Sequence, residues 1–325
     1  MTEPLLWADL PTLARPLVKW SAEVRHLTDL PRMIHRAAKT ALAPPTGPVF
    51  LSLPADILNA EEEVELGSPS RVAPAIRGDR AAVERAAALL ASSERPLVMA
   101  GDAVAQSRAH AELIELVELL GAPVYPESVA NTASFPSSHP LFRGAMDRLA
   151  PKIRAILAEH DVLLSVGADL FSLSLPSAVE PVPGTLKIVH LDIDPWELGK
   201  NFTTEVAILG DPKATLPELT GLLRARMTSA AKSRARERLD EASARNRAER
   251  EALMARAQGE HHRTPVQPSR CSPLSAQPCR RARSWSRRRC RPVSVYASSS
   301  APTIPRAFSA CAAAGSAGAC RRRSA

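Results

Sequence analysis

The chain has 325 residues, of which 45% are hydrophobic, so it is long enough for two domains with buried cores. Its net charge of +8 is unevenly spread: the last 65 residues, from His261 onward, contain 13 Arg and no Lys, Asp or Glu, and the remaining 29 basic residues (42 less 13) face 34 acidic ones. No apolar run approaches the roughly 18 residues of a membrane span, and Met1 is not followed by the basic and apolar regions of a signal peptide. We therefore expect a cytoplasmic protein without a membrane partner.

All five cysteines also lie in this C-terminal stretch: Cys271, Cys279, Cys290, Cys311 and Cys320. Their spacing matches no zinc finger, and nothing indicates a secreted chain, so we predict neither a metal site nor a disulfide framework.

Residues 1–58 are predicted to be the C-terminal part of a domain. Asp29 can cap a helix that has Pro31 in its first turn and apolar residues at helical spacing from Met33 to Ala41. Residues 49–53 read as a strand buried on both faces. One helix and one strand bury too little surface to fold alone. Residues 59–78, with three consecutive glutamates, are predicted to be an exposed linker.

Residues 79–226 alternate between helix and strand. Helices are predicted over 80–92, 107–120, 149–159 and 212–226, and strands over 96–100, 122–125, 162–166, 187–193 and 206–209. This order indicates one complete Rossmann-like α/β domain, with a doubly wound parallel sheet covered by helices on both faces. Residues 227–262 are predicted to be a solvated, charged helical linker, and residues 263–325 a disordered tail.

Several collinear stretches resemble one family of enzymes. They are residues 15–20 (RPLVKW), 47–54 (GPVFLSLP), 121–124 (GAPV), 135–140 (FPSSHP), 142–144 (FRG), 159–164 (EHDVLL), 190–195 (HLDIDP) and 210–213 (GDPK). The first two resemble the end of the pyrimidine-binding domain, and the others resemble the central domain, of thiamine diphosphate-dependent enzymes of the benzoylformate decarboxylase and acetolactate synthase kind.

The resemblance implies a homodimer or homotetramer that decarboxylates or ligates 2-oxo acids with thiamine diphosphate and Mg²⁺. In this family the cofactor carries the chemistry, a Glu in the first domain activates it, and a Gly-Asp-Gly…Asn motif in the third domain holds the metal. Neither feature is found here. We expect the activating Glu to lie before Met1, and the stretches Gly101-Asp102-Ala103 and Gly210-Asp211-Pro212 lack the second Gly and the downstream Asn of the metal motif. We therefore predict an inactive fragment that binds neither cofactor nor metal and has no catalytic, cofactor-binding or metal-binding residue.

The composition of the tail suggests that it is read out of frame. GC-rich codons for residues 310–325, shifted by two bases, can give Met-Arg-Gly-Gly-Gly-Leu-Gly-Trp-Gly-Met-Pro-Ala-Ala-Ile, which resembles the start of the family's diphosphate domain. The slip is placed near Thr264 or Pro265.

Four groups of residues could carry a function. His139, in a Pro-rich loop, is interpreted as structural, and His262 lies two positions from where benzoylformate decarboxylase has a catalytic His, a position taken here by Thr264. Asp192 and Asp194, at a strand end, could bind a ribose, which makes a nucleotide-binding module for FAD or ADP the alternative function, although no G-x-G-x-x-G follows the strand over 96–100. The Arg runs at 287–289 and 321–323 could hold nucleic acid loosely, but no fold or aromatic pattern supports a specific partner.

Overall fold

The computed structural model describes residues 7–73 and 75–259. It divides into two compact units, one of Met1–Phe135 with Ala145–Leu239 and one of Pro136–Gly144 with Asp240–Ala325. The described residues of the first unit contain two separate sheets, of two and five strands.

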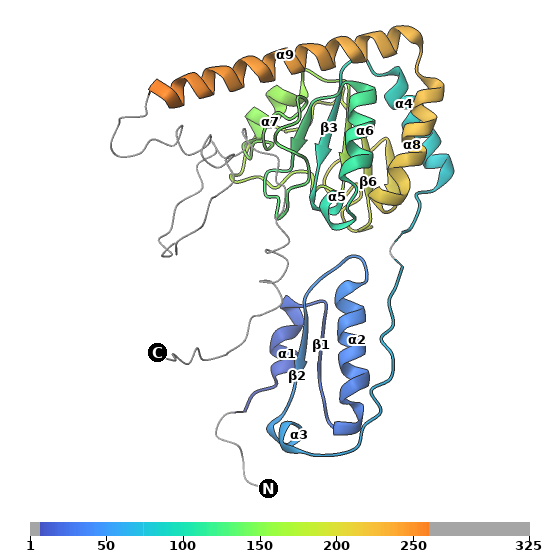
Figure 1. Ribbon diagram of the computed structural model, residues 1–325, viewed down its shortest axis with the longest axis vertical. Coiled ribbons are helices and arrows are strands. Elements are labelled where there is room, and N and C mark those ends of the chain that lie inside the picture. The colour runs from blue at the N-terminus through green and yellow to red at the C-terminus, as the bar shows by residue number, and fades with distance from the viewer. Residues whose placement is uncertain (1–6, 74, 260–325) are drawn as a thin grey trace, which may run out of the picture. The chain divides into compact units, whose positions relative to one another are not determined.

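The two-stranded sheet lies in the N-terminal part of the chain (Figure 1). Strand β1 (Trp20–Glu23) pairs in parallel with β2 (Val49–Ser52), so that Trp20 lies opposite Val49. Helices α1 (Leu10–Ala14) and α2 (Leu30–Leu42) both pack against these strands. Short helical turns η1 (Arg15–Leu17) and η2 (Leu27–Asp29), and helix α3 (Ala55–Asn59), complete this part.

Helix α2 forms where expected, but its start differs in detail. Asp29 precedes the first helical residue without making a side-chain capping hydrogen bond, and its carboxylate lies 3.6 Å from the guanidinium of Arg32 instead. Asp29 is therefore the N-cap residue of the helix, as expected, but its side chain makes no capping hydrogen bond. At the other end, Lys19 Nζ donates to the carbonyls of Thr40 (2.8 Å) and Ala43 (2.5 Å), which serves carbonyls that have no partner within the helix.

The sequence predicted that strand β2 is buried on both faces, and the structure does not bear this out. Val49, Phe50 and Leu51 are only half-buried, because a two-stranded sheet offers them few neighbours. Many large apolar side chains of this part are likewise exposed: Trp7, Leu10, Leu13, Leu17, Ile34, Leu42, Leu53 and Leu58.

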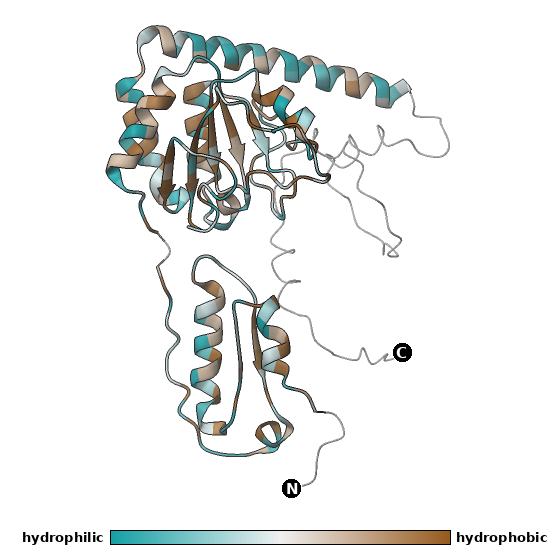
Figure 2. Ribbon diagram, turned by 180° about the vertical axis from the view of Figure 1, so that it is seen from behind, coloured by the Kyte–Doolittle hydropathy of each residue, from teal (hydrophilic) through white to brown (hydrophobic). Residues whose placement is uncertain are grey.

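The five-stranded sheet is parallel throughout. Its strands are β3 (Pro96–Ala100), β4 (Val124–Pro126), β5 (Val162–Val166), β6 (Lys187–Asp192) and β7 (Val206–Leu209), in the order β4-β3-β5-β6-β7. Every residue of β3 and β5 is buried, and Figure 2 shows the strands of this sheet predominantly brown, that is, hydrophobic. Near-continuous apolar strands of this kind belong to parallel sheets covered on both faces.

Helices cover both faces of this sheet. On one face, α4 (Arg80–Ser92), α5 (Asp102–Gln106), α6 (His110–Leu120) and α8 (Pro212–Arg226) pack together. On the other, Ile153 and Leu157 of α7 (Ala150–Leu157) join a buried cluster with Leu97, Leu163 and Ile188 of the strands. The predicted doubly wound α/β fold is confirmed.

The elements differ from the expected ones mainly between β3 and β4. A single helix over 107–120 was expected, whereas the structure has the short α5 and then α6 from His110. Arg108 separates them because its φ of 59° is left-handed and cannot continue an α-helix.

The domain of the five-stranded sheet begins before residue 79, where the sequence placed its start. Gly78 N–H donates to Thr215 Oγ1 (3.1 Å), and Asp211 N–H donates to the carbonyl of Ile76 (2.7 Å). A Cβ on Gly78 would lie 2.4 Å from Cγ2 of Ile208. Residues 76–78, at the end of the expected linker 59–78, thus pack against β7 and α8.

Helix α9 (Ser229–Gly259) confirms the helix expected within 227–262. It is not wholly solvated, because Ala231 and Ala235 are buried, although Figure 2 shows much of it teal. The predicted disordered tail, 263–325, lies outside the described residues. Among the described helices, none is both long and apolar enough to cross a membrane.

Candidate functional site

The candidate site is a crevice at the carboxyl ends of the five-stranded sheet. The chain passes from β3 to β4 on one side and then to β5 on the other, and doubly wound sheets bind ligands where the strand order reverses in this way. A pocket of about 340 Å³ lies there. The loops that follow β3, β4, β5 and β6 line it with six carboxylates: Asp102, Glu127, Asp169, Asp192, Asp194 and Glu197.

Glu127 holds three of these loops together. Its N–H donates to the carbonyl of Ala100 at the end of β3 (3.0 Å). Its two carboxylate oxygens accept the backbone N–H groups of Asp102 and Asp169, each at 2.9 Å. The carboxylate therefore bridges the residues that follow β3 and β5.

Burial raises the pKa of Glu127 to about 7, and the charges of Asp102 and Asp169 push it the same way, while the two backbone N–H groups oppose the shift. Only 8% of the residue is exposed. Desolvation and like charges both disfavour an ionised carboxyl, so Glu127 is about half-protonated near neutral pH.

Asp102 fixes the loop after β4. Its carboxylate accepts the backbone N–H groups of Asn131 (3.0 Å) and Thr132 (2.9 Å), and also their side-chain donors at 2.8 and 2.6 Å. Burial alone would raise the pKa of Asp102, but these hydrogen bonds outweigh it and hold the pKa below its ordinary value.

The structure brings the predicted pair Asp192 and Asp194 into the same crevice, at the end of β6. Asp192 Oδ1 accepts the N–H of Asp194 (2.8 Å), and Asp194 Oδ1 accepts the N–H of Trp196 (2.9 Å). Burial raises the pKa of Asp192 to about 6. Both carboxylates thus shape the turn after β6.

The backbone closes the floor of the crevice between β3 and β5. A Cβ on Gly101 would lie 2.0 Å from the carbonyl oxygen of Gly167, and a Cβ on Gly167, whose φ is +62°, would lie 2.3 Å from Cβ of Ala103. Gly101 N–H donates to the carbonyl of Val166 (2.9 Å), and Ala103 N–H donates to that of Gly167 (3.2 Å). Only glycine permits this crossing.

This arrangement does not suit an anionic cofactor. A diphosphate needs free backbone N–H groups or basic side chains, but the N–H groups of Asp102 and Asp169 are taken by Glu127, and none of the described residues that line the crevice is Lys or Arg. The nearby Lys200 pairs with Asp169 (3.6 Å) and Glu197 (2.6 Å). The alternative of FAD or ADP binding is disfavoured on these grounds.

The described residues also do not fit Mg²⁺ and thiamine diphosphate. No group of three or more His, Cys, Asp and Glu side chains among them is arranged to hold a metal ion. A hard cation needs several oxygen ligands at one point. The crevice carboxylates instead accept backbone N–H groups (Asp102, Glu127, Asp192 and Asp194) or pair with Lys200 (Asp169 and Glu197).

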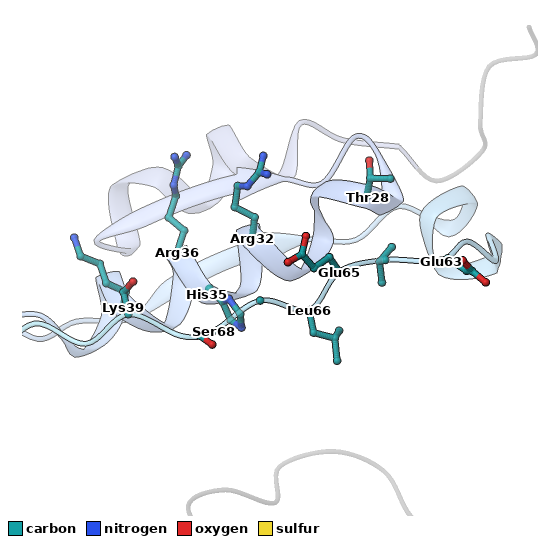
Figure 3. A pocket seen from close by; sticks show the side chains of 12 residues that line it. Thr28, Arg32, His35, Arg36, Lys39, Glu63, Glu65, Leu66 and Ser68 are labelled. Carbon is teal, nitrogen blue, oxygen red and sulfur yellow. The ribbon is translucent and has the colours of Figure 1, made fainter.

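A second pocket lies in the N-terminal part, between α2 and residues 63–70 (Figure 3). Arg32 and Arg36 extend in the same direction from the helix, and a Cβ on Gly67 would lie 3.9 Å from Cε1 of His35. Glu63 and Glu65 contribute opposite charges to the same lining. The arginines are exposed, and none of the described residues that line this pocket is buried.

The other sequence candidates lie in a loop of the second unit or outside the described residues. His139 accepts the N–H of Leu141 through Nδ1 (3.2 Å), and its carbonyl accepts the N–H of Phe142 (3.0 Å), which is a role within its own loop. His261, His262 and the Arg runs at 287–289 and 321–323 lie outside the described residues.

Sequence reasoning missed Glu127, Asp102 and Asp169. Each stands within three residues of the end of a strand of the parallel sheet, so the rule that ligands lie at carboxyl ends could have singled them out. Their pairing through backbone N–H groups carries no sequence signal.

Comparisons with known proteins agree on one family. The sequence model described as "Thiamine pyrophosphate enzyme, central domain" matches residues 83–219. A probable acetolactate synthase large subunit of Methanococcus aeolicus is 33% identical over 214 residues, which are 64% of this chain and 35% of that protein. Benzoylformate decarboxylase of Pseudomonas aeruginosa is 32% identical over 213 residues, 65% of this chain and 40% of that one.

Solved structures give the same result. The crystal structure of benzoylformate decarboxylase from Polynucleobacter necessarius matches with a TM-score of 0.62 and 30% identity, over 68% of this chain and 41% of that one. A putative thiamin diphosphate-dependent enzyme from Mycobacterium smegmatis matches with a TM-score of 0.60 and 28% identity. The chain thus spans roughly two fifths or less of the length of these relatives.

Proposed function

Because residues 83–219 are a central domain of the thiamine pyrophosphate enzyme family, we propose that this chain is an inactive fragment of a 2-oxo acid decarboxylase or carboligase. In this proposal the described residues have a structural role and include no catalytic group. The relatives named as acetolactate synthase and benzoylformate decarboxylase are almost equally similar, at 33% and 32% identity, so the proposal stays at the 2-oxo acid class.

The crossing at Gly101 and Gly167, together with Glu127, carries this proposal. It forms the floor of the crevice where a doubly wound domain would receive a ligand, and Glu127 accepts the backbone N–H groups of Asp102 and Asp169 there. A domain whose crevice offers a ligand neither of these N–H groups and, among its described lining residues, no Lys or Arg is suited to support other parts of an enzyme. We also propose that the intact enzyme is a homodimer or homotetramer.

The test is calorimetric titration of the folded 325-residue chain with thiamine diphosphate and Mg²⁺, together with assays of pyruvate and benzoylformate decarboxylation. We expect neither binding nor turnover. A full-length benzoylformate decarboxylase serves as the positive control, and circular dichroism verifies that the titrated chain is folded. A saturable site of micromolar affinity would contradict the proposal.

A further inference from the structure

Arg238, near the start of α9, attaches this helix to the domain through three backbone carbonyls. Arg238 donates from Nε to the carbonyl of Gly121 (3.2 Å), from Nη2 to that of Leu120 (2.5 Å) and from Nη1 to that of Glu94 (3.1 Å). The buried apolar residues in this part of the helix, Ala231 and Ala235, are small. Apolar burial alone therefore stabilises the attachment weakly.

The three carbonyls are natural acceptors for a cation. Leu120 and Gly121 end α6, whose last carbonyls lack partners within the helix and lie at the negative end of its dipole. An arginine with several rigidly held donors matches such a group better than a lysine does. Burial lowers the pKa of Arg238 somewhat, so the cation has given up water for these acceptors.

Gly121 is shaped for the same contact. Its φ of 59° is left-handed, and a Cβ there would lie 2.2 Å from the carbonyl oxygen of Ala235 and 2.9 Å from the Cα of that residue. The backbone of α9 thus rests directly on the end of α6. This close approach is independent of the arginine.

The third acceptor is itself held in place. Asp161, just before β5, accepts the N–H groups of Glu94 (2.7 Å) and Arg95 (3.1 Å) and the hydroxyl of Ser93. The Glu94 carbonyl is thereby presented to Arg238 from a loop that cannot easily move. Segments before β3, after α6 and before β5 meet at this end of the sheet, and α9 is fastened to two of them.

We propose that Arg238 is a positioning residue that fastens the start of α9 to the amino end of the sheet and so sets where the chain leaves the central domain. The proposal goes beyond the proposed function and does not depend on the substrate or on whether any cofactor binds. It predicts that loss of Arg238 frees residues 229–239 without unfolding the sheet.

Hydrogen–deuterium exchange of the full chain tests this with three variants: Arg238→Ala, Arg238→Lys and, as a control, Arg236→Ala at an exposed position of the same helix. In Arg238→Ala, amides of residues 231–239 should exchange at least about tenfold faster, while those of β3 and β5 are unchanged. Arg238→Lys should give an intermediate rate, because an ammonium can serve only some of the three carbonyls. Arg236→Ala should match the parent chain.

A chemical readout separates a specific guanidinium site from general loss of packing. Millimolar guanidinium or methylguanidinium should restore slow exchange in Arg238→Ala and leave Arg236→Ala unaffected. Gly121→Ala, which displaces Ala235 while leaving Arg238 in the sequence, should also speed exchange of α9. Exchange in Arg238→Ala that stays within about twofold of the parent, or that rises equally in β3 and β5, would overturn the proposal.

Discussion

Glu127 makes the stability of the domain depend on pH. Its pKa is raised from 4.5 to about 7 in the folded chain, so between these values the folded state binds more protons than the unfolded state. The contribution of Glu127 to stability must therefore fall as pH rises from about 4.5 to 7, by roughly 3 kcal/mol at most. Asp192, whose pKa burial raises to about 6, acts in the same direction.

Substitution Glu127→Gln should remove most of this slope, because an amide does not titrate. The free energy of unfolding, measured in urea at pH 5, 6, 7 and 8, should change by about 1–3 kcal/mol less across the series than in the parent chain. Glu205→Gln, at an exposed position, serves as the control and should keep the parent slope. An unchanged slope in Glu127→Gln would show that this carboxyl does not titrate in the range.

His190 works against Glu127 in the same pH range. It is 1% exposed in β6, and neither ring nitrogen makes a hydrogen bond of acceptable geometry, although the Ala168 carbonyl favours the charged ring electrostatically. Burial lowers its pKa to about 4, so between pH 6.5 and 4 the unfolded state binds more protons than the folded state. The contribution of His190 to stability is therefore full above pH 6.5 and falls as pH falls toward 4. In a His190→Leu variant, the free energy of unfolding should fall more steeply as pH rises, so that the effect of Glu127 is easier to measure.

At the scale of elements, the crossing of the connections after β3 and β5 leaves no room for a side chain. Gly101→Ala places a Cβ 2.0 Å from a backbone oxygen that cannot rotate away. We expect a loss of about 3 kcal/mol or more in the free energy of unfolding. Gly184→Ala, where a Cβ meets nothing within 4 Å, is the matched control and should be nearly neutral. Equal stabilities of the two variants would contradict the close packing at Gly101.

The sequence predicted the strands of the main sheet because parallel strands buried on both faces are continuous apolar runs, as in Val162–Val166. It missed β1 because Trp20–Glu23 is short and lacks both a continuous apolar run and a bounding turn signal. It missed α5 because five residues are too few for helical periodicity to show. The crevice pair Asp192 and Asp194 was found from its strand, whereas Glu127 and Arg238 depend on contacts between distant segments.

At the scale of the whole molecule, the N-terminal part contrasts with the five-stranded part. A two-stranded parallel sheet leaves both outer edges unpaired, and the eight exposed apolar side chains named above accompany them. Edges and apolar surfaces of this kind are normally covered in stable proteins. This supports the proposal that the chain is a fragment of a larger fold.

The hydrogen bonds of Ile76 and Gly78 decide where a shortened chain should begin. The family match starts at residue 83 and the predicted domain at residue 79, and a protein cut at either point would lack both residues. The buried turn before α8 would then keep the Asp211 N–H without its acceptor, at a cost of about 1–3 kcal/mol. A protein of residues 75–259 should therefore melt at a higher temperature than one of residues 79–259 in differential scanning calorimetry. Equal melting temperatures would mean that residues 75–78 do not stabilise the domain. A higher melting temperature of the longer protein would make residues 75–259 the better starting material for crystallisation.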